Sequence, residues 1–359
     1  MRHKQVCPNF WASKKVMITG HTGFKGSWLT LWIKSLGADI CGLSLEAPTT
    51  PSLFAQANVS DGIRHEIQDI RDFEGVASVF NSFKPDIVIH MAAQPLVRLS
   101  YDSPIETYGT NVMGTVHVLE ASRRASSVKA IVNVTTDKCY ENREWIWGYR
   151  ENEPMGGRDP YSSSKGCAEL VSSAYGRSFF ENDGIGLATA RAGNVIGGGD
   201  WAKDRLIPDL LNDLERGGTL HVRNPNATRP WQHVLEPLSG YLILAQRLYD
   251  KEVSFSEGWN FGPTDDGERT VGWIAETLAA KWGAAAQIVS QAGEHPHEAN
   301  FLKLDISKAK QQLGWQPKWS LDVALDKIVT WHKAWIANQD LQELCIQQIQ
   351  EYNSEKVIS

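Results

Sequence analysis

A glycine-rich loop between an apolar strand and a helical segment constrains this chain more than any other feature. Lys15–Thr19 predicts a β-strand, and the loop Gly20–Gly26 that follows has the spacing GxxGxxG before an apolar helical stretch. Glycines at these positions allow a tight turn and a close approach of the backbone to a pyrophosphate. The helix N-terminus then offers free N–H groups to the phosphates. The loop therefore predicts a dinucleotide-binding βαβ unit near the start of the chain.

Short apolar runs alternate with helical stretches after this loop. The further candidate strands are Asp39–Leu43, Ile87–Met91, Ala130–Val134 and Ile185–Ala190. The candidate helices are Trp28–Leu36, Val112–Ala121 and Asp159–Ser178. Such alternation is typical of a parallel sheet with helices on both faces. We therefore predict an α/β fold, a doubly wound parallel sheet of the Rossmann type with a smaller C-terminal α/β lobe that binds substrate.

The composition of the chain changes after the fifth candidate strand. Residues 14–190 are predicted to form the cofactor-binding domain, and the chain returns to it at about 229–262, where Trp259–Phe261 resembles a strand. Residues 191–228 and 263–359 are predicted to form the smaller, substrate-binding domain. The loop His295–Glu298 has metal-binding residue types, but no further ligands accompany it, and we predict no metal site.

Charge and hydropathy exclude several functions. The chain of 359 residues has 36 Lys and Arg against 42 Asp and Glu, a net charge of −6, whereas nucleic-acid-binding domains are usually basic. No run approaches the roughly 20 apolar residues of a membrane span, and the first residues do not resemble a signal peptide. The five cysteines include no CxxC pair. We therefore expect a soluble cytoplasmic protein that binds neither nucleic acid nor membrane.

A tyrosine and a lysine have the spacing of a catalytic pair. Tyr161 and Lys165 are four residues apart in a predicted helix, so both side chains can point into one site. A nearby ammonium and the positive nicotinamide of a bound dinucleotide favour the phenolate and are expected to lower the pKa of Tyr161 towards working pH. The phenolate can then remove a proton from a substrate hydroxyl.

Together, the glycine loop and the YxxxK pair resemble the extended form of the short-chain dehydrogenase/reductase superfamily. The resemblance implies NAD as cofactor, with Tyr161 and Lys165 among its contacts. Ser44 stands where an acidic ribose-binding residue is expected, so the local residues leave NAD and NADP open, although Glu46 is near. The other residues expected to contact the cofactor are Gly20, Thr22, Gly23, Phe24, Lys25, Gly26, Ser44, Asp69, Ile70, Ala92, Ala93, Gln94 and Asn111.

Three polar residues come after the candidate strand Ala130–Val134. Thr136 matches the superfamily's Ser/Thr that hydrogen-bonds the reacting oxygen. Asp137 and Lys138 stand where nucleotide-sugar 4,6-dehydratases have a general acid and a general base. Asp137 can be the acid if burial keeps it protonated. Lys138 would need desolvation to act as the base; alternatively, its ammonium stabilises the developing enolate.

Further segments are similar to the CDP-glucose 4,6-dehydratases, which have Lys in place of the dehydratase Glu. These segments are Gly20–Trp28, Thr135–Tyr140, Gly197–Trp201, Asp204–Asp209 and Arg229–Val234. The resemblance implies oxidation at C4 of CDP-glucose, loss of water across C5 and C6, and return of the hydride to C6, in dideoxysugar (O-antigen) biosynthesis. The residues expected to contact the nucleotide sugar are Arg98, Asn194, Asp200, Trp201, Arg205, Arg229, Trp231 and His233.

Two alternatives remain at this stage. One is a related enzyme, either a C4-epimerase or a dehydratase of GDP-mannose or dTDP-glucose. The other is a non-catalytic NAD-binding protein, which would have no use for Thr136, Tyr161 and Lys165. The family commonly pairs through a four-helix bundle that includes the YxxxK helix, so we expect a homodimer or a higher homo-oligomer.

Overall fold

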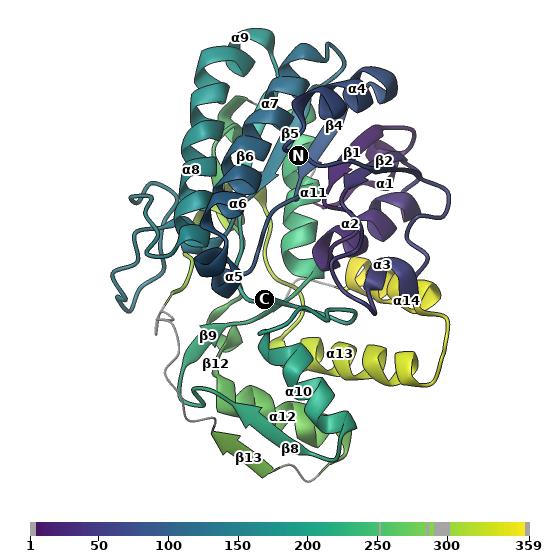
Figure 1. Ribbon diagram of the computed structural model, residues 1–359, viewed down its shortest axis with the longest axis vertical. Coiled ribbons are helices and arrows are strands. Elements are labelled where there is room, and N and C mark those ends of the chain that lie inside the picture. Colours follow the sequence, from purple (N-terminus) through teal and green to yellow (C-terminus); the bar gives the residue numbers. More distant parts are fainter. Residues whose placement is uncertain (1–4, 251–252, 285–286, 291–301, 356–359) are drawn as a thin grey trace.

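The computed structural model describes residues 5–250, 253–284, 287–290 and 302–355. A parallel sheet of seven strands in the order β11-β6-β5-β4-β1-β2-β3 forms its centre (Figure 1). The strands are β1 (Lys15–Thr19), β2 (Asp39–Ser44), β3 (Arg64–Ile67), β4 (Ile87–His90), β5 (Ala130–Val134), β6 (Gly186–Arg191) and β11 (Gly258–Asn260). The predicted doubly wound parallel sheet is confirmed.

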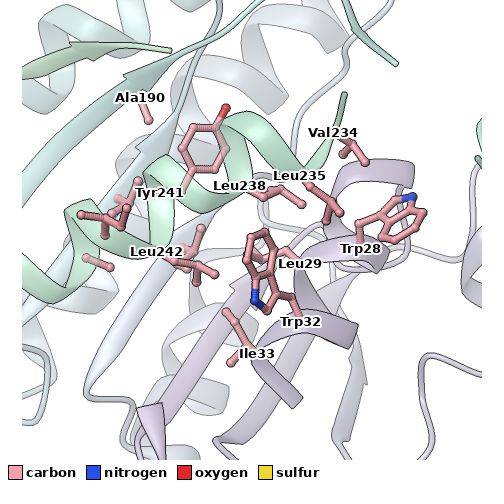
Figure 2. Packing of buried hydrophobic residues seen from close by; sticks show 14 of the residues in the cluster. Trp28, Leu29, Trp32, Ile33, Ala190, Val234, Leu235, Leu238, Tyr241 and Leu242 are labelled. Atoms are coloured by element: carbon pink, nitrogen blue, oxygen red, sulfur yellow. The ribbon is translucent and has the colours of Figure 1, made fainter. Parts of the chain in front are cut away.

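Alternate residues of β1, β2, β4, β5 and β6 pack against helices on opposite faces of the sheet. On β1, Val16 and Ile18 join one core, whereas Met17 joins the other. The first core includes residues of α2 (Phe24–Ser35), α11 (Leu235–Tyr249) and α14 (Leu341–Ser354). Figure 2 shows how side chains of α2 and α11 pack together there. The second receives α4 (Phe73–Phe83), α7 (Gly114–Arg124) and part of α8 (Pro160–Tyr175). Apolar residues on both strand faces therefore explain why the sheet is covered twice.

A smaller lobe lies beyond the carboxyl ends of the strands (Figure 1). Its own core is built mainly from α10 (Leu206–Glu215), α12 (Val271–Trp282) and α13 (Leu321–Ile336). Three two-stranded sheets complete it: β7 (Val195–Ile196) with β10 (Gln232–His233), β9 (Thr228–Pro230) with β12 (Glu268–Thr270), and β8 (Thr219–Val222) with β13 (Gln287–Ser290). The remaining helices are α1 (Pro8–Trp11), α3 (Leu53–Gln56), α5 (Val97–Asp102), α6 (Pro104–Tyr108) and α9 (Glu181–Asp183).

The C-terminal segment contributes both to the part of the molecule built on the seven-stranded sheet and to the smaller lobe. The predicted return to the sheet occurs at β11, which pairs in parallel with β6. The packing of α14 differs from the expectation that all of 263–359 lies in the smaller lobe, because Cys345, Ile349 and Tyr352 join the core under the sheet. Apolar residues on α14 bury against α2 there, so the expected boundaries do not apply to this helix.

Two further sequence-based expectations concern a membrane span and a possible metal-binding loop. No helix in the described part of the chain is both long enough and apolar enough to cross a membrane. The loop His295–Glu298 lies outside the described residues.

Candidate active site

The glycine loop adopts a conformation that only small residues allow. Gly20 has a φ of +76°, and a Cβ on it would lie 2.7 Å from the backbone nitrogen of Ala92. A Cβ on Gly26 would lie 2.1 Å from the carbonyl oxygen of Gly20. Gly23 is the N-cap of α2 and has no side chain to cap the first N–H groups of the helix. This cradle fits the pyrophosphate of a dinucleotide, which accepts hydrogen bonds from such groups.

The other predicted cofactor residues line the strand ends beside this loop. Ser44 ends β2, and its hydroxyl lies 2.7 Å from that of Thr22. The Asn111 side chain accepts a hydrogen bond from the Gln94 backbone N–H at 2.8 Å and donates one to the Ser164 hydroxyl on α8 at 2.9 Å. Asn111 therefore ties the segment after β4 to the helix of the YxxxK pair.

Asp69 and Ile70 come after β3 and differ in exposure. Asp69 forms an ion pair of 2.6 Å with Arg71. The side chain of Ile70 is buried against Gly114, where a Cβ would lie 2.4 Å from the Ile70 methyl group. Packing of this kind shapes the edge of the site without requiring a polar contact from Ile70.

The YxxxK pair lies at the start of α8, next to the end of β5. The Asp159 carboxylate caps this helix by accepting a hydrogen bond from the Ser162 N–H at 2.9 Å. Lys165 donates a hydrogen bond to the carbonyl oxygen of Val134 at 3.1 Å, and Thr136 lies close enough to the Tyr161 hydroxyl to influence its pKa. The structure therefore brings Thr136, Tyr161 and Lys165 together, although they come from two elements.

Burial dominates the titration of this pair. It raises the pKa of Tyr161 to about 12, with the Thr136 hydrogen bond opposing that rise. Burial lowers the pKa of Lys165 to about 8. In the protein alone, desolvation of the phenolate outweighs the Thr136 hydrogen bond and the positive charge of Arg205, and the lowering expected with a bound nicotinamide stays a prediction.

Asp137 is a buried carboxyl beside the same tyrosine. It accepts a hydrogen bond from the Thr136 hydroxyl at 2.9 Å, and only 2% of its surface is exposed. Burial raises its pKa, against the lowering effects of Lys138, the Thr136 hydrogen bond and Arg229. This is the direction that a general acid requires.

Lys138 differs from Asp137 because its side chain is exposed. The structure therefore does not supply the desolvation that the role of base requires. An exposed ammonium next to the buried acid can still stabilise negative charge on a ligand.

Lys25, in the glycine-rich loop, adds a further positively charged side chain near Lys165 and Arg205. Its ammonium donates a hydrogen bond to the Tyr241 hydroxyl at 3.1 Å. Burial lowers the pKa of Lys25 to about 7, and the positive charges of Lys165 and Arg205 contribute to that lowering. Tyr241, on α11, was not among the predicted site residues. It occurs in an apolar helix with no local motif, and only the packing of α11 under the sheet brings it here (Figure 2).

Two of the predicted substrate-binding arginines form ion pairs with acidic residues. Arg205 forms an ion pair of 2.8 Å with the largely buried Asp200, whose carboxylate also accepts a hydrogen bond from the Ala202 N–H. Asp200 therefore orients Arg205. Arg98 pairs with Asp204 at 3.2 Å.

Arg229 lies on β9 and acts electrostatically on the carboxyl of Asp137. Asn194 has a φ of +47°, and its carbonyl oxygen accepts a hydrogen bond from the Gln232 N–H. Both residues therefore lie on the short strands and turns that join the sheet to the smaller lobe.

Three predicted substrate residues pack in cores or against helices. His233 is 1% exposed, and its ring lies 4.8 Å from that of Trp319. Trp231 belongs to the core of the smaller lobe and donates a hydrogen bond to the Arg269 carbonyl. Aromatic packing therefore buries both side chains, and their contact with the substrate stays a prediction. Trp201 is half-buried, edge-on to Trp331 at 5.6 Å.

A parallel sheet with a glycine cradle and a YxxxK pair beside its fifth strand defines the class of short-chain dehydrogenases/reductases. The chain belongs to the GDP-mannose 4,6 dehydratase family, which it matches over residues 17–328. It is 58% identical to a CDP-glucose 4,6-dehydratase of Salmonella typhimurium over 351 residues, which cover 96% of this chain and 98% of the relative. The resemblance inferred from the motifs is therefore confirmed.

Solved structures of the same fold include enzymes of two kinds. A dTDP-glucose 4,6-dehydratase from Streptomyces venezuelae with NAD bound has a TM-score of 0.78 and 24% identity, covering 91% of this chain and 99% of that one. A UDP-glucose 4-epimerase from Thermotoga maritima has a TM-score of 0.78 and 23% identity, covering 90% of this chain and 99% of that one. These similarities establish the fold.

Proposed function

We propose that this protein converts CDP-glucose to CDP-4-dehydro-6-deoxyglucose and water, with NAD as its cofactor. The observation that carries the proposal is Asp137, a buried carboxyl with a raised pKa, bonded to the same Thr136 that contacts Tyr161. A C4-epimerase has no need of an acid for water loss. The 58% identity to a CDP-glucose 4,6-dehydratase supports CDP-glucose as the substrate.

The residues of the glycine cradle support NAD. The uncapped start of α2 would hold the pyrophosphate, and Ser44 and Asn111 stand at the neighbouring strand ends. When bound, NAD supplies a hydride acceptor that is regenerated at the end of the reaction. Its place between the cradle and the YxxxK helix would put it next to Tyr161 and Lys165.

Each catalytic residue has a role that its surroundings explain. Tyr161, once ionised, removes the proton of the C4 hydroxyl, and the Lys165 ammonium favours that ionised form. The C4 hydride would pass to NAD, and the C4 ketone so formed makes the C5 proton acidic. Loss of that proton and of the C6 hydroxyl leaves a double bond, to which the hydride would return at C6 and a proton at C5. Asp137 donates its proton to the departing C6 hydroxyl, which leaves as water. We assign Lys138 to stabilisation of the enolate, because its exposed ammonium is a poor base.

The same proposal includes the setting of the enzyme. A soluble sugar nucleotide as substrate fits a cytoplasmic enzyme, and a 4-keto-6-deoxy sugar is a suitable precursor of dideoxyhexoses in O-antigen. We also propose a homodimer formed through α6, α8 and the neighbouring turns, where Ile105 and Leu170 are 88% and 62% exposed. Apolar residues this exposed are typical of an interface. Light scattering of the purified protein tests the dimer, and a monomeric mass would contradict it.

The decisive experiment is incubation of the purified protein with CDP-glucose and a catalytic amount of NAD, followed by mass spectrometry. We expect loss of one water from the sugar nucleotide without accumulation of reduced cofactor. Parallel reactions with dTDP-glucose, GDP-mannose and UDP-glucose test which nucleotide sugar the enzyme prefers. An unchanged mass with altered sugar stereochemistry would identify an epimerase. No reaction with any sugar, despite bound NAD, would support a non-catalytic protein.

A further inference from the structure

A buried ion pair lies directly behind the catalytic residues. Glu169 is four residues after Lys165 on α8, and Arg191 ends β6; each side chain is 5% exposed. The carboxylate of Glu169 accepts hydrogen bonds from the Arg191 guanidinium at 2.9 and 2.7 Å. Two charges this deeply buried are costly to separate, because either one alone would lose its solvation without compensation.

Two threonine hydroxyls complete the coordination of this carboxylate. Thr135 donates to one oxygen of Glu169 at 2.5 Å, and Thr189 donates to the other at 2.6 Å. Both threonines are 5% exposed. They differ in their place in the chain, because Thr135 directly precedes Thr136 and Asp137, whereas Thr189 lies within β6.

The other side of the ion pair contacts the far end of the same catalytic segment. Arg191 donates a hydrogen bond to the Tyr140 hydroxyl at 2.6 Å. That hydroxyl in turn donates to the side-chain oxygen of Asn260 on β11 at 2.8 Å. The segment 135–140 is therefore fixed at its first residue through Glu169 and at its last residue through Arg191.

We propose that Thr135 and Tyr140 are positioning residues that fasten the segment between them to the Glu169–Arg191 pair. The inference rests on the proposed dehydratase function. Because Glu169 belongs to the helix that carries Tyr161 and Lys165, this arrangement fixes the proton donor Asp137 relative to the residue that acts at C4. Misplacement of a reacting group by a fraction of an ångström slows the step it serves, while other steps continue.

The test compares two isosteric variants that lose equivalent hydrogen bonds. Thr135→Val removes the link between the catalytic segment and Glu169. Thr189→Val removes the second hydroxyl from the same carboxylate and is the matched control. We expect similar thermal destabilisation of both variants. Turnover should fall about tenfold only in Thr135→Val. In that variant reduced nicotinamide should accumulate on the enzyme, because oxidation at C4 continues while proton delivery by Asp137 slows.

Two further measurements make the test independent of turnover. Hydrogen exchange of peptides covering 136–140 in the protein without substrate should increase in Thr135→Val and not in Thr189→Val. Tyr140→Phe should increase the same exchange, since it frees the other end of the segment. Equal exchange and equal turnover in the two threonine variants would overturn the proposal. If the unaltered protein does not dehydrate CDP-glucose, the proposed function fails first, whereas the exchange comparison still tests the positioning role.

Discussion

Gly193 lies directly against the carboxyl group of Asp137. A Cβ built on Gly193 would be 1.8 Å from Oδ2 of Asp137. The two residues come after β6 and β5, which are neighbouring parallel strands, so their distance is fixed by the sheet. The absence of a side chain at position 193 therefore creates the space that the proposed acid occupies.

Gly193→Ala should displace this carboxyl and abolish most dehydration. We expect at least a hundredfold loss of turnover, within the range typical of a lost general acid, and thermal destabilisation from the steric conflict. Gly176→Ala is the matched control, since nothing lies within 4 Å of its Cβ position in a helical turn. That variant should keep its activity and gain up to about 1 kcal/mol of stability. Normal turnover by Gly193→Ala would contradict the assigned role of Asp137.

Asp137→Asn should separate oxidation from water loss. Asparagine keeps the size of the side chain and can still accept the Thr136 hydrogen bond, but it has no acidic proton to donate. Elimination should slow about a hundredfold or more, so that the reduced cofactor accumulates to about one equivalent per active site. Absorbance of the reduced nicotinamide in a single-turnover mixture measures this. A variant that releases the product as fast as the unaltered protein would exclude Asp137 as the acid.

Turnover should stop rising with pH as Lys165 loses its proton. Burial lowers the pKa of this ammonium to about 8, below its ordinary value of 10.5. The charged form is fully present well below that pH and disappears above it, and with it the support for the Tyr161 phenolate. Tyr161, with a pKa of about 12, is ionised in a growing fraction over the same range, so we expect kcat/KM to rise with pH up to about 8 and then to level off. A rate constant that keeps rising to about pH 10 would show that the Lys165 charge is not needed.

Glu236 should make the stability of the fold depend on pH. This carboxyl at the start of α11 is 1% exposed and accepts hydrogen bonds from the Tyr352 hydroxyl and the Trp319 N–H at 2.6 and 2.8 Å. Burial raises its pKa from 4.5 to about 7. The folded state therefore binds the proton more tightly than the unfolded state, and the resulting stabilisation, complete below about pH 4.5, is lost as the pH rises to 7.

Glu236→Gln removes this dependence and tests it. Relative to the variant, the unaltered protein should lose about 3 kcal/mol of unfolding free energy between pH 4.5 and pH 8. Urea unfolding at several pH values measures the difference. Glu276→Gln, at an exposed position of α12, is the control and should follow the unaltered protein. Parallel pH curves for all three proteins would contradict the assignment.

Local motifs predicted the elements that carry the chemistry. The strands Lys15–Thr19 and Ala130–Val134 have the predicted bounds, and Tyr161 and Lys165 share one helix as expected. A glycine turn, an apolar strand and a helical i, i+4 pair each depend on residues close in sequence. Their geometry can therefore be inferred without knowing what packs around them.

The contacts between distant segments required the tertiary structure. Tyr241 reaches Lys25 across 216 positions of the chain because α11 packs under the sheet. His233 is predicted to contact the substrate, and only the tertiary structure shows that its ring packs against Trp319. The sequence by itself thus determined the class of fold and the elements that carry the proposed cofactor loop and the proposed catalytic pair. Only the folded chain decided which polar side chains are buried, and burial sets their pKa values because desolvation depends on every neighbouring element.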